Sequence, residues 1–106
     1  MAEVDYTTDI KKYAPTIDQK AVDAIVRFCG IALKSRDASM VSCSSKDELE
    51  RVRESFLKRK LKMTEDDKAL DQRIQDVCTA MKSDSSKHRV TFYYLLAEKA
   101  KKLGDL

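Results

Sequence analysis

The sequence contains few residues that interrupt helices, with two glycines and one proline among 106 residues. A β-sandwich or barrel needs frequent turn residues, so this scarcity argues against both architectures. Cysteine occurs three times, at spacings that match no disulfide framework. We therefore expect a protein of a reducing compartment, the cytoplasm, that folds without disulfide or metal staples.

Long hydrophobic runs are also missing. The longest, Phe92 to Ala97, has six residues, whereas a membrane-spanning helix needs roughly 20. The N-terminal stretch MAEVDYTTDIKKY has no apolar core of the kind that a signal peptide requires. We expect no membrane partner and no export.

The motifs of common enzymes are absent as well. The chain has no Gly-rich phosphate loop and no H-E-x-x-H motif. His88 is the single histidine, and Cys29, Cys43 and Cys78 do not form the close pairs typical of zinc sites. From these absences we expect no cofactor, no metal and no catalytic residue.

Neither sign of charge dominates, with 21 basic and 18 acidic residues. Basic clusters at Lys58–Lys62 and Lys99–Lys102 could suggest a nucleic-acid partner. However, they lie at the ends of predicted helices, where the helix dipole favours positive charge. The net charge of +3 is also small for a protein that holds phosphates by charge. Nucleic acid is therefore a disfavoured partner.

Apolar residues recur at helical spacing over most of the chain, often after a capping residue. The pattern predicts an all-α fold, a single compact array of about five helices forming one domain over residues 1–106. The expected helices run from Tyr6 to Ala14, from the Thr16/Gln19 capping box to about Leu33, from the Ser45/Glu48 box to Met63, from Thr64 to Met81, and from Ser86 to just before Gly104.

The last of these segments is apolar in every direction, because Phe92 to Ala97 are consecutive. A helix that is hydrophobic all round is buried on several sides. We predict that it is the central helix, or one that also meets a partner. The hydroxyls of Tyr93 and Tyr94 should have hydrogen-bond partners or a route to water. The chain is expected to be a monomer or a weak homodimer.

The longest connection between predicted helices is Lys34–Ser45, in which Met40 and Val41 should hold the middle to the core. Long loops tend to be functional. Cys43 lies before a helix N-terminus that could lower its pKa, so it is either a reactive thiol or an inert loop cysteine. Arg36 and Asp37 are expected to act locally, either as a pair that orders the loop or against helix ends. The candidate functional residues are Ser35, Arg36, Asp37, Cys43 and Ser44.

Three segments carry a resemblance to a known family. They are GIALKSRDASMVSCSSKDEL (residues 30–49), LKRKLKMTEDDKALD (57–71) and RVTFYYLLAEK (89–99). On them the chain resembles a bacterial family of short, stand-alone proteins, domain of unknown function 2853. The resemblance implies an all-helical bacterial protein of the cytoplasm. It implies no activity, cofactor or catalytic residue.

Two functions from different classes follow. The first is a non-catalytic interaction or regulatory domain whose partner is a protein, acting through the Lys34–Ser45 loop and nearby helix ends. The alternative is a small-ligand-binding protein or enzyme that uses Arg36, Asp37 and Cys43 of the same loop. A weak nucleic-acid binder is third. A deep cleft beside Arg36 and Asp37 would favour the alternative.

Overall fold

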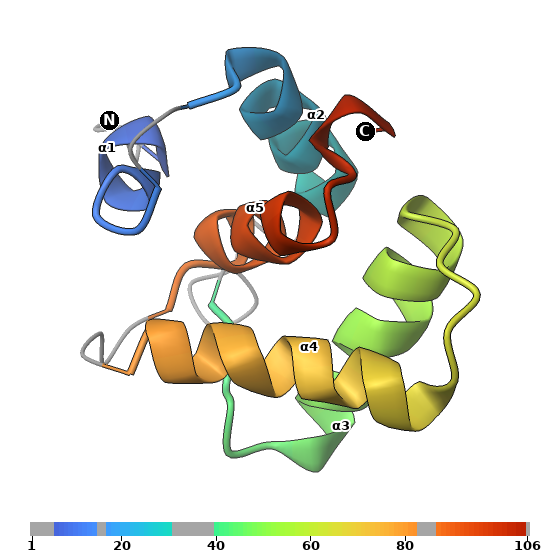
Figure 1. The fold of residues 1–106 in the computed structure, drawn as a ribbon. Coiled ribbons are helices and arrows are strands. Elements are labelled where there is room, and N and C mark those ends of the chain that lie inside the picture. Colours follow the sequence, from blue (N-terminus) through green and yellow to red (C-terminus); the bar gives the residue numbers. More distant parts are fainter. Residues whose placement is uncertain (1–5, 15–16, 31–39, 83–86, 106) are drawn as a thin grey trace.

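The computed structural model describes residues 6–14, 17–30, 40–82 and 87–105. Within these ranges the chain is helical and forms no strand, which confirms the predicted all-α fold (Figure 1). The elements in order are α1 (Tyr6–Ile10), α2 (Gln19–Cys29), α3 (Lys46–Arg51), the π-helix η2 (Val52–Lys60), α4 (Asp67–Ala80), α5 (Arg89–Lys99) and the short 3-10 helix η3 (Leu103–Asp105).

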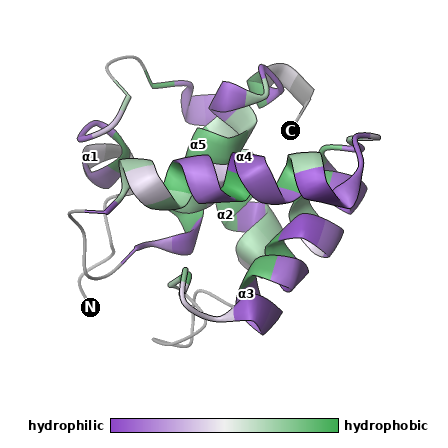
Figure 2. Ribbon diagram, turned by 60° about the horizontal axis from the view of Figure 1, so that its bottom comes forward, coloured by the Kyte–Doolittle hydropathy of each residue, from purple (hydrophilic) through white to green (hydrophobic). Residues whose placement is uncertain are grey.

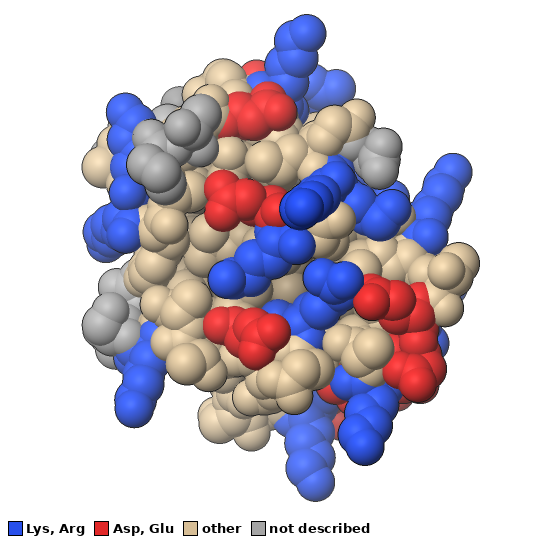
Figure 3. Space-filling view, viewed as in Figure 1, with Lys and Arg blue, Asp and Glu red and all other residues tan. Residues whose placement is uncertain are grey.

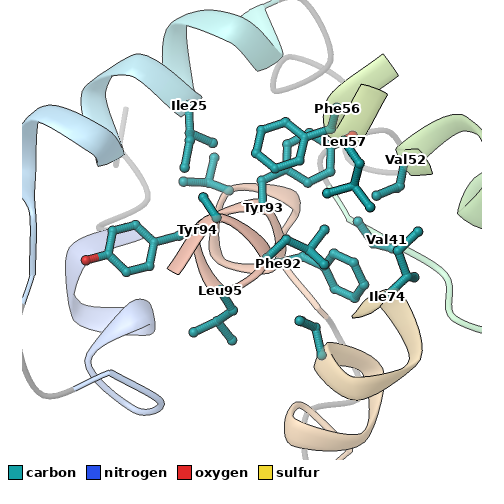
Figure 4. Packing of buried hydrophobic residues seen from close by; sticks show 14 of the residues in the cluster. Ile25, Val41, Val52, Phe56, Leu57, Ile74, Phe92, Tyr93, Tyr94 and Leu95 are labelled. Atoms are coloured by element: carbon teal, nitrogen blue, oxygen red, sulfur yellow. The ribbon is translucent and has the colours of Figure 1, made fainter. Parts of the chain in front are cut away.

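Helix α5 lies at the centre, as predicted, with α1 and α2 on one side and α4 on another (Figure 1). Every residue from Arg89 to Ala97 is buried. Apolar side chains of α2, η2 and α4 surround it (Figure 4). Phe56 of η2 stacks on Tyr93, with ring centroids 4.1 Å apart and an interplanar angle of 16°. The run of consecutive apolar residues therefore does mark the core helix.

Both tyrosine hydroxyls of α5 have hydrogen-bond partners, as expected. The Tyr94 hydroxyl accepts a bond of 2.9 Å from the backbone N–H of Asp18. The Tyr93 hydroxyl accepts one of 2.9 Å from the guanidinium of Arg89. These bonds satisfy polar atoms that would otherwise be costly to bury.

Several helix boundaries differ from the predicted ones by a few residues. Asp18 and Asp66 cap α2 and α4, in place of the threonines two residues before each, since aspartate is at least as good a cap as threonine. Helix α2 ends at Cys29, and Gly30 after it has a positive φ of 46°, the left-handed region that favours glycine at a helix end. The rest of the predicted segment, as far as Leu33, lies outside the described residues. Helix α1 ends at Ile10, and α5 begins at Arg89 and ends at Lys99.

The third predicted helix is not a single α-helix. After α3 the chain continues for nine residues as the π-helix η2, in which the bonding step is five residues. The N–H of Leu61, for example, donates to the carbonyl of Phe56 over 2.9 Å. The wider helix places Val52, Phe56 and Leu57 in the core together. Such helices are rare and frequently occur at functional sites.

Helix α4 has the amphipathic pattern predicted for it. Its buried residues are Leu70, Ile74, Val77 and Cys78. Figure 2 shows hydrophilic residues along its outer side. None of the described helices is both long and apolar enough to cross a bilayer.

Candidate functional site

The predicted functional loop is described only in its second half, because Ser35, Arg36 and Asp37 lie outside the described residues. A cleft beside Arg36 and Asp37 also falls outside them. Val41 is buried, and its N–H donates to the carbonyl of Lys87 over 2.8 Å. Met40 forms an isolated bridge with His88. The predicted attachment of this segment to the core is thus confirmed, and the start of α5 provides it.

Cys43 is neither a reactive thiol nor an inert free cysteine, because it forms a disulfide with Cys78 of α4. The expectation of no disulfide was wrong. The fold brings the segment before α3 against the C-terminal half of α4, with the two Cα atoms 6.1 Å apart, which is within bridging range. Ser44 next to it is exposed, and Ser42 and Ser44 share a hydroxyl hydrogen bond of 3.1 Å.

The remaining cysteine, Cys29, is free and buried. Burial raises the pKa of its thiol to about 11, although the positive charge of Arg89 opposes part of that rise. A thiol with so high a pKa is a poor nucleophile at neutral pH. Among the described residues, moreover, no three His, Cys, Asp or Glu side chains lie close enough together to hold a metal ion.

Arg89, at the start of α5, is buried although it carries a charge. Its guanidinium donates to the hydroxyl of Tyr93 at 2.9 Å, to the carbonyl of Met40 at 3.3 Å and to the carboxylate of Glu48. Burial by itself would lower its pKa, but Tyr93 and Glu48 outweigh burial and the pKa is raised. Through these bonds Arg89 fastens Met40 and Glu48 to the start of α5.

Phe28 of α2, which the sequence analysis missed, contacts Tyr93 of this network. Its side chain is 39% exposed and is the large hydrophobic side chain that the described part of the chain leaves open to solvent. Its ring contacts those of Phe56 and Tyr93, at centroid distances of 5.7 and 6.2 Å. Lys60 holds its ammonium 5.8 Å from the Phe28 ring centroid, a cation–π distance. Phe28 is therefore an exposed ring backed by the aromatic core.

A shallow hollow of about 360 Å³ opens beside this ring. We call it the Phe28 hollow; its lining residues are Ala24, Arg27, Phe28 and Lys60. Two of these are basic and none is acidic. One feature of the sequence could have indicated this site. Phe28 is a large apolar residue that lies outside the buried stripe of Val22, Ile25 and Cys29 on the same helix.

Residues 5–104 match the model of one protein family. The chain belongs to the family described as Protein of unknown function (DUF2853). The match spans nearly the whole chain and confirms the resemblance that the three sequence segments carried. A comparison with curated proteins found no match. Membership of DUF2853 assigns no activity and no ligand.

This DUF2853 chain has a second hollow, of about 340 Å³, between α3 and α4. Its floor includes Leu49 and Ile74, and its rim carries both signs of charge. Arg53 on that rim makes two bonds to Asp71, of 3.0 and 3.2 Å. Because these charges neutralise each other, the α3–α4 hollow would not select a ligand by its charge. The Phe28 hollow is therefore the stronger candidate site.

Proposed function

We propose that this DUF2853 protein is a non-catalytic interaction domain that binds a segment of a partner protein at the Phe28 hollow. The observation that carries the proposal is the exposed ring of Phe28, held from below by Phe56 and Tyr93. An aromatic side chain fixed in this way loses little rotamer entropy on binding. Aromatic residues and arginine are the residues that most often dominate binding energy at interfaces.

The charges around the ring specify the partner. Arg27 and Lys60 line the hollow, with no acidic residue among the lining side chains. An apolar side chain placed on Phe28 would be flanked by these two cations. The complementary ligand is an acidic segment that carries one apolar anchor between carboxylates, since complementary charge speeds encounter and excludes wrong partners.

We place this function in the bacterial cytoplasm, the setting that the family resemblance implies. The Cys43–Cys78 disulfide is unusual for a reducing compartment. The location therefore has to be tested on the intact cell, by alkylating thiols before lysis and measuring the fraction of the bridge that is oxidised. A bridge that is fully oxidised in cells would overturn a cytoplasmic location.

The test of the interaction uses a photo-crosslinking amino acid at position 28 of the full chain. The matched control carries the same amino acid at Thr79, an exposed position on α4. Both proteins are irradiated in the cytosol of the source organism, and the crosslinked peptides are sequenced. We expect a crosslink at position 28 that is absent at position 79, to a peptide with an apolar residue between acidic ones.

Two charge-reversed variants, Arg27→Glu and Lys60→Glu, complete the experiment. Each should reduce the yield of that crosslink at least fivefold while the helical circular dichroism signal stays unchanged. A crosslink to a second copy of this chain, to a basic or uncharged peptide, or to nothing would overturn the proposal. A crosslink that survives both reversals would also overturn it.

A further inference from the structure

A third hollow, of about 230 Å³, lies where the end of η2 and the start of α4 meet the end of α5. We call it the cationic hollow; its lining residues are Lys62, Met63, Thr64, Glu65, Arg73, Ala100 and Lys102. Three of them are basic and one is acidic. Figure 3 shows basic side chains gathered over this part of the molecule, with acidic ones beside them. The volume is below the roughly 300–1,000 Å³ of drug-sized ligand sites, so a small group would fit.

Two lysines, one lining this hollow and one next to lining residues, occupy positions that normally favour glycine. Lys62 and Lys101 have φ values of 54° and 59°, and no other described non-glycine residue has a positive φ. Each follows a helix end, where glycine adopts the left-handed conformation without strain. Lys62 lines the hollow, and Lys101 lies between two lining residues. Left-handed backbone thus occurs at residues 62 and 101, in two of the chain segments at this hollow.

The acidic residue at the hollow already shows how an oxyanion binds there. The two carboxylate oxygens of Glu65 accept from Nε and Nη2 of Arg73, at 2.7 and 3.1 Å. The hydrogen bond from Arg73 lowers the pKa of Glu65, and the charge of Lys102 lowers it further. The Glu65 side chain is 40% exposed, so it can swing away without unfolding the core. A planar arginine fork of this kind also suits phosphate oxygens.

We infer that the cationic hollow binds the phosphate group of a small ligand, either inorganic phosphate or a phosphomonoester. The phosphate takes the place of the Glu65 carboxylate on Arg73, and Lys62 and Lys102 supply the further positive charge that a dianion needs. This phosphate site is separate from the proposed protein interaction and uses other residues. Either proposal can therefore be wrong without affecting the other.

The test is an NMR titration of the amide groups at constant ionic strength, near pH 7.5, with chloride as the replaced anion. Inorganic phosphate and free O-phosphoserine are titrated separately, to distinguish the bare ion from a phosphomonoester. We expect saturable shifts at residues 62–65 and 100–102 and at the Nε–H of Arg73. The probe that saturates at the lower concentration identifies the source of the phosphate group.

A pair of matched variants separates local binding from general electrostatics. Lys62→Gly and Lys101→Gly each remove one charge and relieve one left-handed lysine, so neither should lower the thermal midpoint. Only Lys62→Gly removes a lining side chain, and it should weaken phosphate binding at least fivefold, whereas Lys101→Gly should change it less than twofold. Glu65→Gln should tighten binding several-fold, because the internal competitor has lost its charge.

Equal weakening by Lys62→Gly and Lys101→Gly would overturn the inference, since it would show a diffuse charge effect. Shifts that fail to saturate with either probe would also overturn it. Weaker binding in Glu65→Gln would show that the carboxylate supports the ligand and does not compete with it, which would contradict the displacement step.

Discussion

The guanidinium of Arg89 donates to the carboxylate of Glu48, which lies 41 residues earlier in the chain. Their side chains are only 6% and 14% exposed. This pair joins α3 to the start of the central helix. It is the most deeply buried of the ion pairs among the described residues, so its loss should affect folding more than that of any surface pair.

Replacing Glu48 by alanine should lower the free energy of unfolding by about 3–5 kcal/mol, because the Arg89 charge would remain buried without its counter-ion. Denaturant unfolding measures the change. Asp47→Ala is the control, since Asp47 is exposed in the same helical turn and its dipole interaction is worth about 0.3–1 kcal/mol. Similar losses in the two variants would contradict the assigned role of Arg89.

Truncating Phe92 to alanine should cost about 3–5 kcal/mol, because the ring is fully buried in the centre of the core. Phe28→Ala, in contrast, should cost much less, since the Phe28 ring is partly open to solvent. Unfolding is followed at several protein concentrations. A midpoint that rises with concentration would indicate the homodimer, with the aromatic core shared between two copies, whereas a constant midpoint would indicate the monomer.

Reduction of the Cys43–Cys78 disulfide should destabilise the folded state by about 3–4 kcal/mol. The bridge spans 35 residues, and closing a loop of that length restricts the unfolded chain. The measurement compares denaturant unfolding with and without a thiol reductant. The Cys43→Ala variant should be insensitive to the reductant, whereas Cys29→Ala should respond as the unaltered protein does.

Alkaline pH should destabilise the protein through Cys29. The pKa of this thiol is about 11 in the folded state, against 9.0 as its ordinary value, and burial is the main cause. The unfolded chain therefore releases the proton first, so stability is complete below about pH 9 and is lost as the pH rises toward 11. Burial also raises the pKa of Tyr93 above its ordinary value of 10.0, so the loss of stability continues to higher pH.

Unfolding free energies measured from pH 8 to 11 should show this decline. The Cys29→Ala variant should start slightly less stable at pH 8, because a small core side chain is shortened, but its stability should fall less steeply to pH 11. Parallel pH profiles for the two proteins would mean that Cys29 ionises equally in both states and is not shielded from solvent.

The central position of α5 could be predicted because it depends on local sequence alone. Its apolar residues are consecutive, so no orientation leaves them all outside the core. The helix caps were displaced by two residues, since Thr16 and Asp18, like Thr64 and Asp66, are alternative caps whose choice depends on tertiary packing. The position of an all-apolar helix was thus predictable from the sequence. The exact first residue of a helix was not, where two capping residues stand two positions apart.

The candidate site could not be predicted, because it depends on distances in space. Cys43 and Cys78 become neighbours only after α4 folds back on the segment before α3. Likewise, Phe28 of α2 and Lys60 at the end of η2 are far apart in sequence and meet only in the folded chain. No local sequence pattern indicates such a contact between distant residues. The Lys34–Ser45 loop was chosen as the candidate site because of its length.

The burial of α5 on all sides has a consequence for synthesis. Helices α1, α2 and α4 pack against it and precede it in the chain, so their apolar faces stay uncovered until residue 97 has been synthesised. At roughly 5–20 residues per second, the chain from α2 onward stays without a core for several seconds. Ribosome-bound chains that stop before α5 should therefore be protease-sensitive along their whole length, and folding should be a single event that follows translation of the aromatic segment.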